Sequence, residues 1–287
     1  MKPIASKKST VSEKVTAICF FILFLMIALL CTFPLVWAIN NSLKTDFDFS
    51  EDSFSITETW SFSNYVDIFN GVFNYKNFDY FGMLFNSLWM VAVRVVVNVA
   101  SSAMLAYAIA KFRFPGKDLL YVIVIFVNTI PVIGSGPAAF RLLHFFDMIN
   151  KPWKLWLSWA SGFDFAFIVL YGYFKGVSPS YSEAAYIDGA GEMRVFLSIV
   201  VPQVVPCLVA IMITQAIGVW NDYSTPMVYL SDMPNLALGL YEFERVVPSN
   251  RPLFLAAASV SAVPIIVLYA CTQNLIMTNM TAGGLKG

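Results

Sequence analysis

The chain has 287 residues, of which 58% are apolar and only 13% are charged, and its 18 basic residues equal its 18 acidic ones. A soluble domain carries about 25% charged residues, so this composition excludes an ordinary soluble protein and indicates a membrane protein. The balanced charge gives no reason to expect a nucleic-acid partner.

Apolar segments along the chain predict six membrane-spanning helices. A span needs about 20 predominantly apolar residues, and four longer runs contain no charged residue. Two further apolar segments are interrupted by one charge each, Arg94 and Asp164. No segment shows the alternation of a barrel strand, so helices are expected and the fold class is an all-α membrane protein. The predicted spans are residues 15–43, 84–110, 119–140, 155–174, 195–221 and 252–285.

The first predicted span stands apart from the other five. Residues 1–82 would form an N-terminal cytoplasmic segment, the first helix and a long outer loop. Residues 83–287 would form a five-helix core with an outer loop at 222–251, in which several prolines predict irregular backbone with short helices. Four lysines precede the first span and place both termini in the cytoplasm. These lysines are Lys2, Lys7, Lys8 and Lys14. The predicted location is the cell membrane (the inner or cytoplasmic membrane), which the chain would cross several times.

The four cysteines show neither disulfide nor metal-site spacing. Each lies in an apolar stretch, so they are predicted to be small buried thiols, and no metal ligand set is expected. They are Cys19, Cys31, Cys207 and Cys271.

A short charged island at 178–201 separates the fourth and fifth predicted spans. Either Ser178 followed by Pro179, or Ser180 in a capping box with Glu183, would begin a helix that runs to about Ala190. A second short helix would follow and end before Pro202. Ala185 and Gly189 would share one face, where a partner's backbone can approach closely. An ordinary interfacial loop helix and a docking surface for a soluble partner both fit this pattern.

The residues of the island also match a known motif. Glu183-Ala184-Ala185 and Asp188-Gly189-Ala190 resemble the coupling motif of ATP-binding-cassette (ABC) importer permeases, in particular the maltose-type second permease subunit of carbohydrate uptake. Met193 and Val201 depart from the usual pattern. Further matching segments follow in order along the chain, namely 86–88, 106–108, 112–116, 130–131, 220–222 and 281–287.

This resemblance implies a type I importer permease fold with a cytoplasmic coupling helix between helices four and five. It implies that a sugar or oligosaccharide passes through a pore formed by a heterodimer with a homologous second permease. An extracellular or periplasmic binding protein would deliver the sugar, and two ATPase subunits or an ATPase homodimer would drive transport. The implied ATPase-coupling residues are Glu183, Ala184, Ala185, Ile187, Asp188, Gly189, Gly191 and Lys286.

The chain lacks a glycine-rich phosphate-binding loop of its own. We therefore expect a transport subunit rather than an enzyme, without a bound cofactor. ATP and magnesium would bind to the partner ATPase, and membrane lipid would surround the helices.

Polar and aromatic residues within or beside the predicted spans are candidates for the substrate pathway. A sugar needs aromatic faces and hydrogen-bonding groups, but helix–helix hydrogen bonds would explain the same residues. The charged side chain of Arg94 is energetically unfavourable in lipid unless it is paired. It would pair with Asp164 or an acid of the second permease, or else contact an anionic sugar. The other candidates are Asn128, Asp164, Tyr171, Gln215, Trp220, Asn221 and Asp222.

Other function classes fit the sequence less well. An importer permease for phosphate, peptides or metals stays open, because the coupling motif is shared. A secondary transporter would show repeated halves, which we do not find. A membrane enzyme would need a nucleophile–base pair or a metal site, and a single histidine with scattered carboxylates does not supply one.

Overall fold

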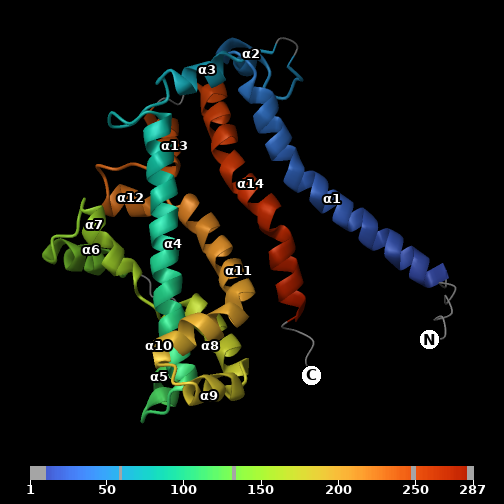
Figure 1. Cartoon of the computed structure of the whole chain (residues 1–287). Coiled ribbons are helices and arrows are strands. Elements are labelled where there is room, and N and C mark those ends of the chain that lie inside the picture. Colours follow the sequence, from blue (N-terminus) through green and yellow to red (C-terminus); the bar gives the residue numbers. More distant parts are fainter. Residues whose placement is uncertain (1–10, 58–59, 131–133, 247–249, 283–287) are drawn as a thin grey trace.

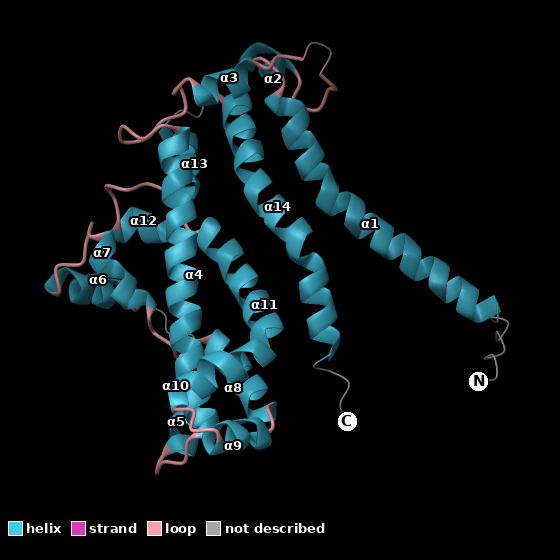
Figure 2. Cartoon of the chain, in the orientation of Figure 1, coloured by secondary structure: helices cyan, strands magenta, loops and turns pink. Residues whose placement is uncertain are grey.

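A computed structural model describes residues 11–57, 60–130, 134–246 and 250–282. Within these ranges the regular elements are helices joined by turns and short loops (Figure 2), which confirms the predicted all-α class. Four helical segments are long and apolar enough to cross a membrane. They correspond to α1 (Val11–Ser42), α4 (Tyr80–Lys111), α11 (Val201–Trp220) with the residues just before it, and α14 (Arg251–Ala282).

The four long helices differ in how much of their surface the chain covers. Helix α4 packs on α11, and α11 packs on α14 (Figure 1). Helix α1 meets α14 near one end and then diverges from the rest of the molecule. None of the apolar window of α1 is buried, against 28% for α4 and 33% for the α11 segment. Helix α1 therefore presents an apolar surface to its surroundings rather than to the core of this chain.

Two of the six predicted spans are not continuous helices. The segment 119–140 divides into α5 (Lys117–Thr129) and α6 (Gly136–Phe145), and 155–174 divides into α7 (Pro152–Trp159) and α8 (Phe165–Gly176). Figure 1 shows α6 and α7 to one side of α4, while α5 and α8 lie beside its far end. Neither of these two predicted spans is therefore a single helix.

Each of these breaks has a local cause. Ile130, which precedes a proline in the sequence, has extended backbone angles, as residues before proline prefer. In the second break Gly162 adopts a φ of +65°, and a Cβ there would lie 2.3 Å from Leu105 Cδ1 and 3.3 Å from the Ser101 carbonyl. Glycine thus lets the break pass close to α4, and Asp164 then begins α8 as its N-cap.

Short helices fill both regions that were predicted as long loops. Gly239 lets the last of these helices, α13 (Leu236–Val246), lie close against α4. A Cβ at this position would lie only 2.3 Å from Met83 Sδ. The prediction of short helices between 222 and 251 is confirmed. These four helices are α2 (Asp46–Glu51), α3 (Ser63–Phe69), α12 (Ser224–Tyr229) and α13 (Leu236–Val246).

The main core lies between α4, α8 and α11. Val99 and Ala103 of α4 are buried in the same apolar cluster as Phe167 and Leu170 of α8 and Val204 of α11. Small residues such as Ala103 let neighbouring helices approach closely. The core therefore holds the inner faces of three helices in fixed register.

The cysteines correct one prediction. Cys207 is buried, but Cys19, Cys31 and Cys271 are exposed. In a membrane protein the outer surface is itself apolar, so apolar neighbours in the sequence do not imply burial in the protein.

Candidate functional site

The helix α9 (Pro179–Ile187) begins at a serine cap. The Ser178 hydroxyl accepts a hydrogen bond from the Ser180 amide at 3.4 Å. Pro179 occupies the first turn, where its missing N–H costs nothing. Of the two caps that the sequence allowed, Ser178 is the one used. Helix α9 lies at the end of the molecule where α4 terminates (Figure 1).

A glycine fixes the other end of α9. The Gly189 amide donates to the Tyr186 carbonyl at 3.0 Å, and the Ala190 amide donates to the Ala185 carbonyl at 2.9 Å. This pair of bonds is a Schellman motif, which requires a positive φ directly after the C-cap. Gly189 has a φ of +80°, and a Cβ there would meet open space. The backbone conformation, rather than crowding, therefore demands glycine.

From Glu192 onward, after the turn that ends α9, the chain forms one continuous helix to the end of α11. Helix α10 (Glu192–Val195) continues through a π-helical turn (Phe196–Val200) into the long helix. The sequence predicted a separate short helix that ends before Pro202, and this is wrong. Pro202 follows directly on the π-helical turn, where the α-helical hydrogen-bond pattern is already interrupted, so its missing N–H is tolerated there. A displacement of α10 would thus act directly on a membrane-spanning helix.

The predicted coupling residues do not all lie on the surface. Ala185 is only 7% exposed and packs in the main core, so it does not face a partner as the shared-face argument had predicted. Ile187, in contrast, is 87% exposed despite its apolar side chain. Lys286 lies outside the described residues. We call the exposed set the α9 surface, which consists of Glu183, Ala184, Ile187, Asp188, Gly189 and Gly191.

Behind the α9 surface, aromatic rings join α4, α8 and the π-helical turn. The Tyr107 ring centroid lies 5.8 Å from that of Phe174 and 4.7 Å from that of Phe196. The Tyr186 hydroxyl of α9 donates to Glu192 Oε2 at 2.7 Å. Burial, together with this bond to a carboxylate, raises the pKa of Tyr186. We call Tyr107, Phe174 and Phe196 the aromatic node.

A polar cavity of about 350 Å³ lies between α4, the α7–α8 break and α11. Three predicted pathway residues, Arg94, Asp164 and Gln215, line it. Gln215 Nε2 donates to Asn98 Oδ1 at 2.7 Å. Sequence reasoning missed Asn98, although it follows Arg94 by four positions and so shares its helix face. The remaining polar and aromatic lining residues that it missed are Ser158, Trp159 and Ser161.

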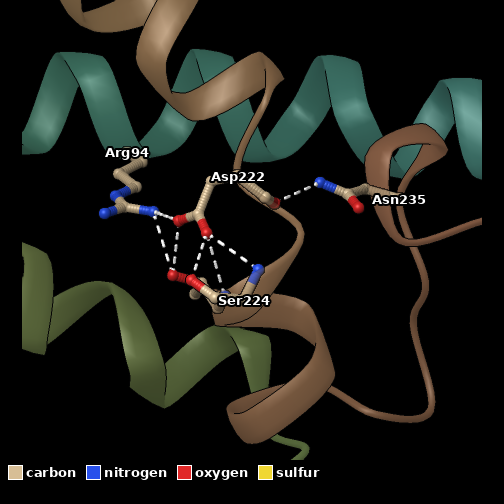
Figure 3. A network of polar contacts seen from close by, with 5 residues as sticks. Arg94, Asp222, Ser224 and Asn235 are labelled. Carbon is tan, nitrogen blue, oxygen red and sulfur yellow. Dashed lines mark hydrogen bonds and ion pairs between the residues drawn. The ribbon is translucent and has the colours of Figure 1, made fainter. Parts of the chain in front are cut away.

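Arg94 pairs with Asp222, and not with Asp164, which was one of the partners that the sequence suggested. Its Nη1 lies 2.6 Å from Asp222 Oδ2 and 3.3 Å from Thr225 Oγ1 (Figure 3). Burial raises the pKa of Asp222, but bonds from Thr225, Arg94 and Ser224 more than offset it and hold the pKa at about 2. Asp164 instead caps α8 and accepts the Ser102 hydroxyl at 3.0 Å. The charge on α4 is therefore neutralised by the turn after α11.

The other predicted pathway residues lie away from this cavity. Asn128 donates to the Phe163 carbonyl at 3.1 Å, so it links α5 to the α7–α8 break. The Tyr171 ring stacks on Tyr121, with 4.2 Å between centroids. Both residues therefore make contacts between segments of this chain, which was the alternative to substrate binding that the sequence left open.

Trp220 and Asn221 line a second cavity, of about 490 Å³, between α11, α13 and α14. Trp220 Nε1 donates to the Ser261 carbonyl at 3.2 Å. The Asn221 side chain bonds to its own helix at Ile217. Across the described ranges, no group of three or more histidine, cysteine, aspartate or glutamate side chains is arranged to hold a metal ion.

Comparison with known protein families gives a match over most of the core. Residues 99–276 match the family described as "Binding-protein-dependent transport system inner membrane component". This stretch includes α9, the aromatic node and most of the polar cavity, but it begins after Arg94.

Similar curated proteins align over most of this chain. The arabinooligosaccharides transport permease AraQ of Halalkalibacterium halodurans is 28% identical, covering 92% of this chain and 94% of its own. The diacetylchitobiose uptake permease NgcG of Streptomyces coelicolor is 28% identical over 87% and 82%. The maltose/maltodextrin transport permease MalG of Vibrio vulnificus is 29% identical over 71% and 72%.

Among solved structures, a chain of a bacterial ABC transporter involved in the import of the acidic polysaccharide alginate has the same fold. Its TM-score is 0.79 at 21% identity, and the match covers 94% of this chain and 99% of that one. A second alginate transporter structure, in complex with an alginate-bound periplasmic protein, gives a TM-score of 0.58 at 14% identity.

Proposed function

Because this chain belongs to the family of binding-protein-dependent transport system inner membrane components, we propose that it is the permease subunit of an ATP-driven importer for a sugar or oligosaccharide. It would form the pore as a heterodimer with a homologous permease and receive its solute from an extracellular or periplasmic binding protein. The named relatives that transport arabinooligosaccharides, diacetylchitobiose and maltose support a sugar as the solute.

The α9 surface is the observation that carries this proposal. It combines two carboxylates, a nearly fully exposed isoleucine and a glycine turn at the end of the bundle. An exposed apolar side chain rimmed by polar groups is typical of an interaction site. The occupant would be the cytoplasmic ATPase, which would hold ATP and magnesium, while this chain would bind no cofactor.

The topology follows from that assignment. If α9 faces the cytoplasm, then the ends of α4 and α14 nearest to it and the start of α1 face the cytoplasm as well, and both termini lie inside. The short helices α2, α3 and α13 then lie outside, where the binding protein would dock. The exposed apolar surface of α1 would contact lipid or the second permease.

Reconstitution tests this function. The chain, its partner permease, the ATPase and the binding protein are placed in proteoliposomes, and uptake of diacetylchitobiose, arabinotriose and maltotriose is measured. We expect ATP-dependent accumulation of at least one sugar, lost on Glu183→Ala and kept on Asp147→Asn, which removes an exposed acid just after α6. ATP-independent uptake, or uptake that Glu183→Ala leaves unchanged, would contradict the proposal.

A further inference from the structure

The charges around the polar cavity do not favour an anionic ligand. Among its described lining residues, Arg94 and Asp164 are the charged ones. Asp222 lies 2.6 Å from Arg94 and neutralises it, so the carboxylate of Asp164 is the uncompensated formal charge. A ligand that carries its own carboxylate would therefore be repelled at short range, where the low dielectric strengthens the interaction.

The unused hydrogen-bonding groups of the cavity include both donors and acceptors. Arg94 uses only Nη1 for Asp222 and Thr225, so its Nε and Nη2 donors have no bonded partner among the described residues. On the acceptor side, Asp164 accepts hydrogen bonds through Oδ1 alone and Gln215 bonds through Nε2. Asp164 Oδ2 and Gln215 Oε1 are therefore available within the described part of the chain.

A hydroxyl group matches this combination, because it donates one hydrogen bond and accepts others. A carboxylate only accepts, so it would satisfy Arg94 and leave the oxygens of Asp164 and Gln215 facing another acceptor. Trp159 adds an aromatic wall. The volume of about 350 Å³ lies at the small end of the range of roughly 300–1,000 Å³ for small-molecule sites, which suits a single sugar unit.

We propose that this cavity is a saccharide subsite within this chain, and that it accepts an uncharged sugar unit through its hydroxyls and rejects a uronate. The inference rests on the proposed transport function and goes further, because it assigns both a binding site and a charge preference. The Arg94–Asp222 pair then serves to leave one end of the guanidinium free while cancelling the charge that would attract an anion.

Trp159 supplies a reporter for the test. The complete transporter in nanodiscs is titrated with diacetylchitobiose, arabinotriose, maltotriose and digalacturonate, and tryptophan fluorescence is recorded. We expect a saturable change with at least one neutral sugar and none with digalacturonate at ten times its concentration. The change should persist in Trp153→Phe, which alters an exposed tryptophan on the same helix, and disappear in Trp159→Phe.

A charge variant tests the preference directly. Asp164→Asn removes the uncompensated charge while asparagine still caps α8. We expect at least a tenfold gain in affinity for digalacturonate. The matched variant Asp118→Asn, an exposed acid in the first turn of α5, should show no gain.

The outcomes separate the subsite from the function. Sugar uptake without any Trp159-dependent change would overturn the subsite and leave the transport function intact. Equal binding of digalacturonate and the neutral sugar by the unmodified chain would overturn the charge preference. Failure of all ATP-driven uptake would count against the proposed function, whereas the fluorescence change would still report on the cavity.

Discussion

The two halves of helix α4 are joined to the rest of the chain by different sets of contacts. Near Lys111 the helix packs through the aromatic node, in which Tyr107 touches rings of α8 and of the π-helical turn. The half nearer Tyr80 also packs in an apolar cluster, with Met83 beside Phe73 and Phe243, but it adds side-chain hydrogen bonds and an ion pair to the 222–236 segment. Ser87 accepts from the Leu236 amide at 2.9 Å, Asn86 donates to the Pro234 carbonyl at 2.8 Å, and Arg94 pairs with Asp222.

This difference separates two mechanical roles. Closely packed rings are barely compressible, so a push on α9 and α10 passes through the aromatic node into α4 and α8. Hydrogen bonds are directional and hold one geometry, which positions the 222–246 segment relative to α4. We therefore infer that the α9 end transmits movement and that the opposite end fixes the mouth of the pathway. The predictions below test this division.

The largest effect is expected at Gly189. A Gly189→Val substitution places a β-branched residue at a φ of +80°, where an L-residue costs about 1–2 kcal/mol, and it adds bulk to the α9 surface. We expect the transporter to reach the membrane and to lose binding-protein-stimulated ATPase activity almost completely. The measurement is ATP hydrolysis by the purified complex with and without the loaded binding protein.

Gly134 offers a matched control for this experiment. It has a φ of +86° with open space around it, and it lies just before α6, outside α9 and α10. Gly134→Val should cost a similar backbone strain and leave ATPase stimulation in place. If both variants lose stimulation equally, strain alone explains the loss and the α9 surface has no special role.

The second effect concerns the aromatic node. Phe196 is 7% exposed, so Phe196→Ala should lower the free energy of unfolding by about 3–5 kcal/mol through the cavity that it leaves. It should also weaken ATPase stimulation, because α10 would no longer push on Tyr107. The neighbouring Leu197→Ala removes an exposed side chain that is 55% accessible and should change neither quantity much. Thermal unfolding in detergent and the ATPase assay measure the two effects, and normal stimulation in Phe196→Ala would exclude the node from transmission.

The third prediction addresses the hydrogen-bonded half of α4. Asp222→Asn keeps the shape of the side chain and leaves Arg94 without its counter-charge, so we expect a loss of about 1.5–3 kcal/mol in the free energy of unfolding. Adding Arg94→Gln should recover part of that loss, because no unpaired charge then remains. The exposed pair Arg251–Glu244 provides the comparison, and Glu244→Gln should cost only about 0–1 kcal/mol. A double variant less stable than Asp222→Asn would show that the pair is not what holds this half together.

The same carboxylate predicts a pH dependence. The pKa of Asp222 is lowered to about 2 from an ordinary value of 3.8. A depressed pKa in the folded state contributes stability that is complete above the ordinary value and is lost as the pH falls towards the folded value. The stability difference between the unmodified chain and Asp222→Asn should therefore be constant from neutral pH to about 5 and shrink below about 4. Melting curves across this range measure it, and a difference that shrinks already between pH 7 and 5 would refute the assignment to Asp222.

The sequence predicts well what depends on local composition. Charge-free runs located the long helices α1, α11 and α14, and an apolar segment interrupted only by Arg94 located α4. Ser178 with Pro179 was one of the two caps proposed for α9. The island resemblance placed a surface helix where α9 lies. These features depend on neighbouring residues only, so no tertiary information was needed.

Tertiary contacts explain the failures. Asp164 was the nearest acid within a predicted span, yet Arg94 meets Asp222, which a helix end 128 positions away brings to it. Asp164 is instead the cap of a new helix, a role that becomes visible only when the 155–174 span is seen to break at Gly162. Ala185 looked like a docking position from its spacing, but the packing of α9 against the core turned it inward. Hydropathy indicates which residues lie in a span, but it does not show which of them contact one another.

The smallest effect is expected at Tyr186. Its hydroxyl joins α9 to α10 through Glu192, and burial together with that bond raises the pKa, so the group stays protonated and the bond persists at alkaline pH. Tyr186→Phe should cost about 0.5–1.5 kcal/mol and reduce ATPase stimulation only partly, because the aromatic node remains. Tyr181→Phe, at an exposed position of the same helix, should be neutral. In a double-variant cycle with Glu192→Ala the second substitution should add little, since one bond is removed by either change. Fully additive losses would mean that the two side chains act separately and that packing alone carries movement from α9 to α10.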